Sequence, residues 1–225
     1  MKGRKHIVLT VGGMIGAGKT TVTKLIADRL DFTAYYEDVD NNQILPLFYT
    51  ATPEEQERKR YPFLLQLEFL NSRFRVIKDV LLDEQHAIMD RSIYEDHYFA
   101  RINNQIGDIS DVEFSIYEKL LHNMMEELEE LPKKAPDLMI FLDISFEKTM
   151  ERIAKRGRDF EQDEALKSYY FTLWKDYRDW VENYYDKSDV YIIDMDKYDI
   201  ETSEADRQEI VSDIKQWCAD RGVHV

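Results

Sequence analysis

Short runs of apolar residues recur along the chain and alternate with longer segments of mixed polarity. The clearest runs are "HIVLTV" (6–11), "AIMD" (87–90), "LMIFLDI" (138–144) and "VYIID" (190–194), and "TAYYE" (33–37) is a weaker one. Short runs rich in β-branched residues are typical of strands that are buried on both faces of a sheet. The runs therefore predict the strands of one buried sheet.

The intervening segments have apolar positions at helical spacing. We predict helices at 19–30, 55–82, 93–104, 112–130, 146–156, 163–185 and 203–220. Strands that alternate with helices predict a parallel sheet covered on both faces, with right-handed crossovers. Functional side chains then lie beyond the carboxyl ends of the strands. Since no repeat, low-complexity segment or linker interrupts this pattern, we expect residues 1–225 to form one domain.

Composition narrows the class of partner. Of the 225 residues, 44% are hydrophobic and 33% are charged, and the formal net charge of −15 argues against nucleic acid or an anionic membrane as a partner. No apolar run approaches the ~20 residues of a membrane span, and the apolar run after the basic N-terminus is too short for a signal peptide. The single cysteine, Cys218, indicates a reducing compartment, so we expect a cytoplasmic protein.

A glycine-rich segment follows the first predicted strand. The segment "GMIGAGKT" fits the pattern G-x-x-x-x-G-K-[ST] of a phosphate-binding loop, and a helix is predicted to begin at its lysine. Glycines let successive backbone N–H groups point at phosphate oxygens, and the helix N-terminus adds its positive dipole. Lys19 supplies a charge and Thr20 a hydroxyl for Mg²⁺. The predicted phosphate-binding residues are Gly13, Met14, Ile15, Gly16, Ala17, Gly18, Lys19, Thr20 and Thr21.

This loop predicts a nucleoside triphosphate ligand, and by itself it leaves open a GTPase, a motor or a small-molecule kinase. A switch GTPase is disfavoured because no N-K-x-D guanine-reading motif follows the loop.

Acidic residues follow two of the predicted strands. Glu37, in "YYEDVDNN", lies within reach of the loop and can accept a proton from an attacking hydroxyl. Asp38 is interpreted as part of a solvated acidic loop. In "MDRSIYED" (89–96), Asp90 can hold Mg²⁺ directly or through water, and Arg91 can clamp a phosphate or hold Glu37 through two parallel hydrogen bonds. Asp90 or Ser92 can also cap the next helix, which is compatible with these roles.

Basic residues gather at one place in an otherwise acidic chain. The segment "ERIAKRGRDFEQ" (151–162) carries Arg152, Lys155, Arg156 and Arg158, the first three on one helical face. A helix end followed by an arginine-bearing loop is typical of a lid that closes on ATP and neutralises the transferred phosphoryl group. A solvated basic face is the alternative.

The long helical segment 63–82 has two apolar stripes separated by polar residues. Gln66 and Arg73 lie between the stripes, two turns apart, whereas the exposed arc holds charged and polar side chains. Buried polar groups must find hydrogen bonds. The pair therefore predicts either a structural buried network or a group that reads a nucleobase.

Together these motifs resemble the deoxynucleoside kinase family, most closely the bacterial deoxyadenosine/deoxyguanosine kinases. The matching pieces are "GMIGAGKTT", "YYEDVDNN" with "LPLFY", "FLLQ…FLNSRFR", "DRSIYED" and "KRGRDFEQ…YY…LW", in the family's order over nearly the whole chain. The resemblance implies a P-loop NTPase-type three-layer sandwich, with a five-stranded parallel sheet flanked by helices and an arginine-bearing lid. It also implies a homodimer, or a hetero-oligomer with a paralogue.

The resemblance implies roles for individual residues. Glu37 matches the general base for the 5′-hydroxyl, with Lys19 and Arg91 as its catalytic partners. Asp90 and Arg91 match the family's acidic-Arg-Ser motif, and Thr20 and Asp90 remain the metal ligands suggested above from the residues themselves. The remaining matches are Tyr49 and Glu161 to the sugar 3′-hydroxyl, Gln66, Arg73 and Asp96 to the base-reading set, and Arg152, Arg156 and Arg158 to the lid. Because Arg73 and Asp96 would each be costly if buried alone, we expect them to pair.

Three positions depart from the family pattern. The segment between Tyr49 and Gln66 is longer than usual, Gln43 stands where bacterial members carry proline, and the residues after Asp96 are shifted by about one position. The shift leaves the base-stacking aromatic residue unassigned.

The sequence thus predicts an enzyme that uses ATP and Mg²⁺ to phosphorylate the 5′-hydroxyl of deoxynucleosides, with purines preferred, in nucleotide salvage. The alternatives are a nucleoside monophosphate kinase on the same scaffold and a catalytically silent nucleotide-binding subunit. The first would need basic groups near Glu37, and the second conflicts with the intact Lys19, Glu37, Asp90 and Arg91.

Overall fold

The computed structural model describes residues 6–39, 41–83, 85–127 and 135–225. Its sheet has five parallel strands in the order β2-β3-β1-β4-β5, which confirms the parallel sheet predicted from the apolar runs. The strands are β1 Val8–Gly13, β2 Thr33–Tyr35, β3 Ala87–Asp90, β4 Leu138–Asp143 and β5 Asp189–Asp194.

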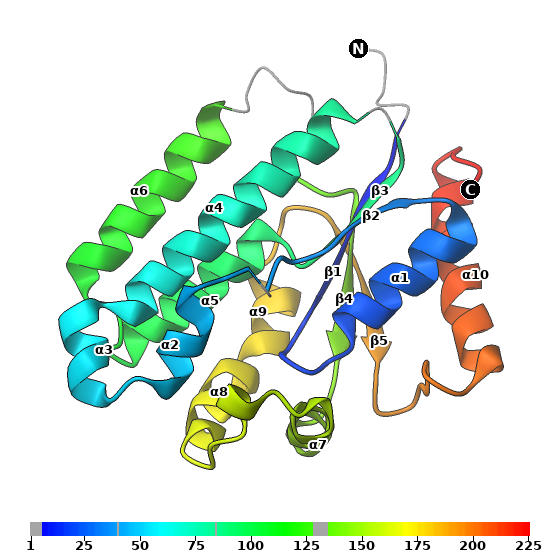
Figure 1. Ribbon diagram of the computed structural model, residues 1–225. Coiled ribbons are helices and arrows are strands. Elements are labelled where there is room, and N and C mark those ends of the chain that lie inside the picture. Colours follow the sequence, from blue (N-terminus) through cyan, green and yellow to red (C-terminus); the bar gives the residue numbers. More distant parts are fainter. Residues whose placement is uncertain (1–5, 40, 84, 128–134) are drawn as a thin grey trace.

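Helices cover both faces of the sheet. They are α1 Lys19–Leu30, α2 Ile44–Thr50, α3 Pro53–Lys59, α4 Tyr61–Leu82, α5 Ile93–Gln105, α6 Asp111–Glu127, α7 Phe146–Arg156, the 3₁₀ helix η2 Asp159–Glu161, α8 Leu166–Lys175, α9 Tyr177–Asn183 and α10 Glu204–Asp220. Helices α1 and α10 lie on one face, and α4, α5 and α6 lie on the other (Figure 1). This is the three-layer sandwich that the resemblance implied.

The central strands are buried because apolar helices pack on both of their faces. All six residues of β1 and all four of β3 are buried, which explains their continuous apolar runs. Strand β1 pairs with β3 on one side and with β4 on the other. Its carboxyl end, where the glycine-rich loop begins, therefore lies in the middle of the sheet edge where ligands bind in such folds.

The helix predicted at 55–82 is two helices, so this prediction was wrong. Helix α3 begins with a capping box, in which Thr52 and Glu55 exchange side-chain and backbone hydrogen bonds. The chain then adopts a left-handed conformation at Arg60, with φ of 56°, and α4 begins with Pro62 in its first turn. Pro62 has no N–H to continue the first helix, and a proline is well tolerated at a helix start.

The helix predicted at 163–185 is likewise interrupted. Helices α8 and α9 are separated at Asp176, whose φ and ψ are −108° and 4°. Helix α2 was missed because it is short and contains Pro46; the side chain of Asn42 accepts hydrogen bonds from its first N–H groups. The predicted helix at 112–130 is α6, and its last three predicted positions lie outside the described residues.

Helix α4 has the two apolar stripes and the polar centre that its sequence predicted. Gln66 and Arg73 are 4% and 2% exposed, between buried apolar neighbours. The predicted exposed arc faces solvent at Glu68, Asn71 and Arg75. Among the described helices, none combines the length and the apolar character that a membrane crossing requires.

Candidate active site

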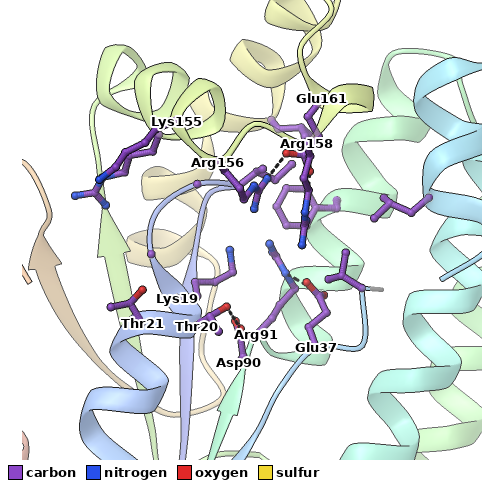
Figure 2. Close-up of a pocket in the computed structure, with 18 of the residues that line it drawn as sticks. Lys19, Thr20, Thr21, Glu37, Asp90, Arg91, Lys155, Arg156, Arg158 and Glu161 are labelled. Carbon is purple, nitrogen blue, oxygen red and sulfur yellow. Dashed lines mark hydrogen bonds and ion pairs between the residues drawn. The ribbon is translucent and has the colours of Figure 1, made fainter. Parts of the chain in front are cut away.

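A cavity of about 850 Å³ lies at the carboxyl ends of the central strands. Its walls come from the glycine-rich loop and α1, the segment after β2, α2, α4, the start of α5, α7 with η2, and residues 198–201. Figure 2 shows the lid residues facing the loop, Arg91 and Glu37 across the open centre. Most of the predicted site residues therefore line one cavity.

The glycine-rich loop connects β1 to the first turn of α1. Gly16 and Gly18 have φ of 81° and 97°, left-handed values that an L side chain would strain. The Lys19 ammonium group donates to the carbonyl oxygens of Gly13 and Met14, each at 3.0 Å. Burial, and then the positive charge of Arg91, lower the pKa of Lys19 to about 8. The loop can thus cradle phosphates with its backbone and its lysine.

Thr20 and Asp90 meet beside the loop, as the sequence predicted for a metal site. The Thr20 hydroxyl donates to Oδ2 of Asp90 at 2.6 Å. In the part of the chain that the structure describes, the buried Oδ1 of Asp90 has no hydrogen-bond partner. Burial raises the pKa of Asp90, and Lys19 and Thr20 oppose that rise.

This donor set fits Mg²⁺. The ion is usually held by one or two protein oxygens together with substrate phosphates, and the hydroxyl and free carboxylate oxygen found here suit that mode. No group of three or more His, Cys, Asp or Glu side chains within the described ranges could hold a metal by itself. A metal bound at Thr20 and Asp90 would therefore complete its coordination with water or with phosphate oxygens.

Glu37 is held by two arginines. Its Oε1 accepts from Nη2 of Arg73 at 2.6 Å and lies 3.5 Å from Nε of Arg91. Burial alone would raise the pKa of Glu37, but Arg91, Arg73 and Lys19 outweigh it and hold the pKa below its usual value. The carboxylate is therefore ionised at neutral pH. The sequence allowed two parallel hydrogen bonds between Arg91 and Glu37. The structure has a single 3.5 Å contact between them, because Arg73 makes the short hydrogen bond to Glu37.

Arg73 joins three elements beneath the cavity. It contacts Glu37, donates from Nη1 to the carbonyl oxygen of Asp90 at 2.7 Å, and donates from Nε to Asp96 at 3.1 Å. The predicted pairing with Asp96 is confirmed. Of the three residues assigned to base reading, Gln66 and Asp96 line the cavity, whereas the described lining does not include Arg73.

Arg91 occupies a strained backbone position directly after β3. Its φ is 79°, which is rare for a non-glycine residue and costs backbone strain. The guanidinium group lies over the ring of Phe99, 4.7 Å from its centroid, and is almost fully buried. The strain turns this side chain into the cavity beside Glu37 (Figure 2).

Asp38, the next acid of "YYEDVDNN", is less constrained than Glu37. Asp38 is exposed and accepts from the side-chain amide of Asn41 at 2.9 Å, as expected of a solvated loop, although it also lines the cavity rim. Asp40 lies outside the described residues.

Tyr49 and Glu161 lie close to each other in the cavity wall. The Tyr49 ring lies 6.3 Å from that of Tyr170 between centroids. Burial, followed by nearby Tyr170, Tyr169 and Glu161, raises the pKa of Tyr49 well above 10. Tyr170 in turn donates to the carbonyl oxygen of Glu161 at 3.4 Å. The ring of Tyr49 also stacks on Phe160, at 5.6 Å between centroids. Both predicted sugar-binding residues therefore line the same part of the cavity.

The three arginines that the sequence assigned to a lid occupy two different environments. Arg156 and Arg158 both pair with Glu161, the latter at 3.5 Å, and are about one-third exposed. Arg152 instead donates to the carbonyl oxygen of Ala17 in the phosphate loop at 2.8 Å. Gly157, with φ of 68°, ends α7 between these positions, as predicted. All three arginines line the cavity.

Two parts of the wall were missed from the sequence. Leu45 and Phe48 of α2 pack with Leu65 and line the cavity beside Tyr49. The signal for them was the apolar "LPLFY" after Asn42, which was used for the resemblance but assigned no helix. Residues 198–201 line the opposite end, and their polar, unperiodic sequence gave no indication of this position.

Comparison with protein families matches residues 9–219 to the family described as deoxynucleoside kinase. A deoxyguanosine kinase from Lactobacillus johnsonii is 45% identical over 92% of this chain and 90% of its own length. A deoxyadenosine kinase from Lactobacillus acidophilus is 41% identical, with 93% and 95% covered.

Solved structures share the fold. The deoxyadenosine kinase from M. mycoides, described with products dCMP and a flexible dCDP bound, has a TM-score of 0.76 to this chain at 24% sequence identity. The match covers 93% of this chain and all of that one. At this identity the likeness supports the fold.

Proposed function

The chain belongs to the deoxynucleoside kinase family and is a kinase, and from this premise we propose that it transfers the γ-phosphoryl group of ATP to the 5′-hydroxyl of a purine deoxynucleoside. The observation that carries the proposal is the position of Glu37. Its carboxylate is kept ionised by Arg73 and Arg91, and it lines the same cavity as the phosphate loop. A base in this place suits a hydroxyl acceptor.

In the proposed reaction, Glu37 accepts the proton of the 5′-hydroxyl as the oxygen attacks the γ-phosphorus. The bond from this phosphorus to the bridging oxygen breaks, and ADP leaves. The backbone of the phosphate loop and Lys19 hold the donor phosphates, and Arg91 with the lid arginines stabilises the charge on the transferred group. A 5′-hydroxyl that keeps its proton is a poor nucleophile. The lowered pKa of Glu37 leaves its carboxylate ionised at neutral pH and therefore able to accept that proton.

Thr20 and Asp90 are the proposed protein ligands of Mg²⁺, directly or through water. Support comes from the hydroxyl–carboxylate contact and from the second, unpartnered oxygen of Asp90 in the described chain. The ion would neutralise the phosphate oxygens.

The acceptor is proposed to lie between α2 and α4, with its sugar at Tyr49 and Glu161 and its base near Gln66 and Asp96. A phenol beside a carboxylate suits the 3′-hydroxyl, which can donate one hydrogen bond and accept another. The Gln66 amide can likewise offer a donor and an acceptor to a purine edge. The names of the two Lactobacillus relatives, a deoxyguanosine and a deoxyadenosine kinase, support a purine.

Turnover of radiolabelled ATP with each deoxynucleoside and each deoxynucleoside monophosphate tests the proposal. We expect labelled 5′-monophosphates from deoxynucleosides and no transfer to monophosphates, because Glu37 would repel an acceptor phosphate. Transfer to monophosphates would instead identify a nucleoside monophosphate kinase. ATP binding without any turnover would identify a catalytically silent subunit.

We further infer a single kinase domain over residues 1–225, acting in cytoplasmic nucleotide salvage as a homodimer. The one five-stranded sheet supports the single domain. Exposed apolar residues along α6, namely Val112, Ile116 and Leu120, support self-association. Light scattering coupled to size exclusion tests the dimer; a mass of 26.9 kDa at micromolar concentration would refute it.

A further inference from the structure

Glu95 is a fully buried carboxylate that no part of the proposed reaction uses. It lies in the first turn of α5, directly beneath the start of the phosphate loop, and its side chain is 0% exposed. Oε1 accepts from the backbone N–H of Gly13 at 3.0 Å and from the phenol of Tyr177, and Oε2 accepts from the N–H of Ser92 at 2.9 Å. A helix cap explains only the contact with Ser92.

Tyr177 reaches Glu95 from α9, 82 positions further along the chain. Its ring is fixed among other aromatic rings: it stacks on Tyr98 with centroids 4.7 Å apart and packs against Phe99, Phe141 and Trp180. Burial, and then the charge of Glu95, raise the pKa of Tyr177 well above 10. The phenol therefore remains protonated and donates to the carboxylate.

The position of Glu95 links the two cationic elements of the site. The peptide unit of Gly13 is held at both ends, since its N–H donates to Glu95 and its carbonyl oxygen accepts from Lys19 at 3.0 Å. On its other side, Oε1 of Glu95 lies 3.6 Å from Nη1 of Arg91. The fit is close, because a Cβ at Gly12 would meet the carboxylate at 3.1 Å.

We propose that Glu95 and Tyr177 form a buried positioning pair that fixes the phosphate loop relative to Arg91. Glu95 contacts Gly13 and Arg91, and Tyr177 of α9 holds Glu95 in that place from among aromatic rings of α5, β4 and α9. Neither is among the described residues that line the cavity, so they act through Lys19 and Arg91 rather than on substrate. The inference rests on the proposed kinase function.

The test compares Tyr177→Phe with Tyr185→Phe. Tyr185 packs against the same Trp180 ring, but its phenol hydrogen-bonds Ser188, at 2.8 Å. We expect Tyr177→Phe to lower kcat per folded enzyme about tenfold, equivalent to about 1.4 kcal/mol. Its KM for the deoxynucleoside should stay within about twofold of wild type, because the acceptor wall is untouched. Tyr185→Phe should retain wild-type kcat.

Glu95→Gln and the double variant Glu95→Gln/Tyr177→Phe complete a cycle. If Tyr177 acts through Glu95, the double variant loses no more kcat than Glu95→Gln alone. The inference would be overturned if the kcat losses of the two single variants multiplied in the double variant. It would also be overturned if a folded Tyr177→Phe variant had wild-type kcat. Should Tyr177→Phe fail to fold, wild-type kcat in folded Glu95→Gln would overturn it. A wild-type protein inactive on every deoxynucleoside would refute the kinase proposal instead, before either variant is made.

Discussion

Two ion networks beside the cavity lie in different environments. At the acceptor end, Arg73, Asp96 and Glu37 form a network whose side chains are 2%, 3% and 16% exposed. At the lid, Arg156 and Arg158 pair with Glu161 while remaining 35% and 31% exposed. Both networks hold arginines against largely buried carboxylates, and they differ chiefly in the access of water to the arginines.

This difference determines which end can rearrange. A charge in the acceptor network cannot leave its partner without remaining buried and unpaired, so this network is fixed before substrate binds. Arg156 and Arg158 are each about one-third exposed, so water can solvate either of them when it leaves Glu161 for a phosphate. Glu161 is itself buried, and the second arginine keeps it paired during the exchange. We therefore expect a preorganised nucleoside site facing a lid that changes partners.

The largest expected effect is on stability, in the variant Asp96→Ala. It leaves Arg73 with one buried carboxylate partner fewer and should destabilise the protein by about 3–5 kcal/mol. Denaturant unfolding measures this. The matched control is Glu201→Ala, which removes an exposed pair with Lys155 and should cost nothing measurable. Equal losses in the two variants would contradict the comparison.

Next in size is the effect of Glu37→Gln on catalysis. If Glu37 is the general base, kcat should fall by about 100-fold or more, whereas the KM for the deoxynucleoside should change little. Because Glu37 also holds Arg73 and Arg91, thermal unfolding must show that the variant is folded. An unchanged kcat in a folded variant would rule out this role.

The contact with the sugar 3′-hydroxyl is expected to contribute less to catalysis than Glu37 does. Removing the substrate's 3′-hydroxyl, as in a dideoxynucleoside, should leave Tyr49 and Glu161 unpaired at a cost of about 1–3 kcal/mol in kcat/KM. Tyr49→Phe should remove part of the same interaction, so its loss and that of the dideoxy substrate should not add. Additive losses would mean that Tyr49 does not contact this hydroxyl.

The smallest expected effect is that of pH on the use of ATP, through Lys19 of the phosphate loop. The pKa of Lys19 in the empty site is about 8, so the lysine is charged below pH 8 and loses its proton above it. The kcat/KM for ATP should therefore fall above pH 8, approaching about tenfold per pH unit. The alkaline limb of kcat should lie higher, since bound phosphate stabilises the protonated lysine. A kcat/KM that stays flat to pH 9.5 would contradict this.

The sequence predicted the sheet well because its strands are buried on both faces. The run 87–90 coincides with β3, and the helices at 19–30 and 146–156 coincide with α1 and α7, since a glycine or a polar cap marks their ends. The breaks at Arg60 and Asp176 were missed. A long-range contact accompanies each break: Arg60 bonds Glu113, and Tyr177, which adjoins Asp176, bonds Glu95. The periodicity of the local sequence carries no information about such contacts.

The site was predicted where one helix or loop carries several of its residues. The two apolar stripes of α4 predicted that Gln66 and Arg73 are buried. The cost of a buried unpaired charge predicted that Arg73 pairs with Asp96. Which arginine contacts which carboxylate depends on the distances between helices and loops, and the sequence could not predict it. The sequence assigned Glu161 to the sugar alone, whereas the structure pairs it with Arg156 and Arg158. Arg73 rather than Arg91 makes the short contact with Glu37.

The most direct measurement is kcat/KM for deoxyadenosine, deoxyguanosine, deoxycytidine and thymidine under one set of conditions. A fixed acceptor site, in which Gln66 and Asp96 face the base, predicts that the better purine exceeds both pyrimidines by at least about tenfold, or roughly 1.4 kcal/mol. A preference for thymidine or deoxycytidine would contradict this account of the base pocket.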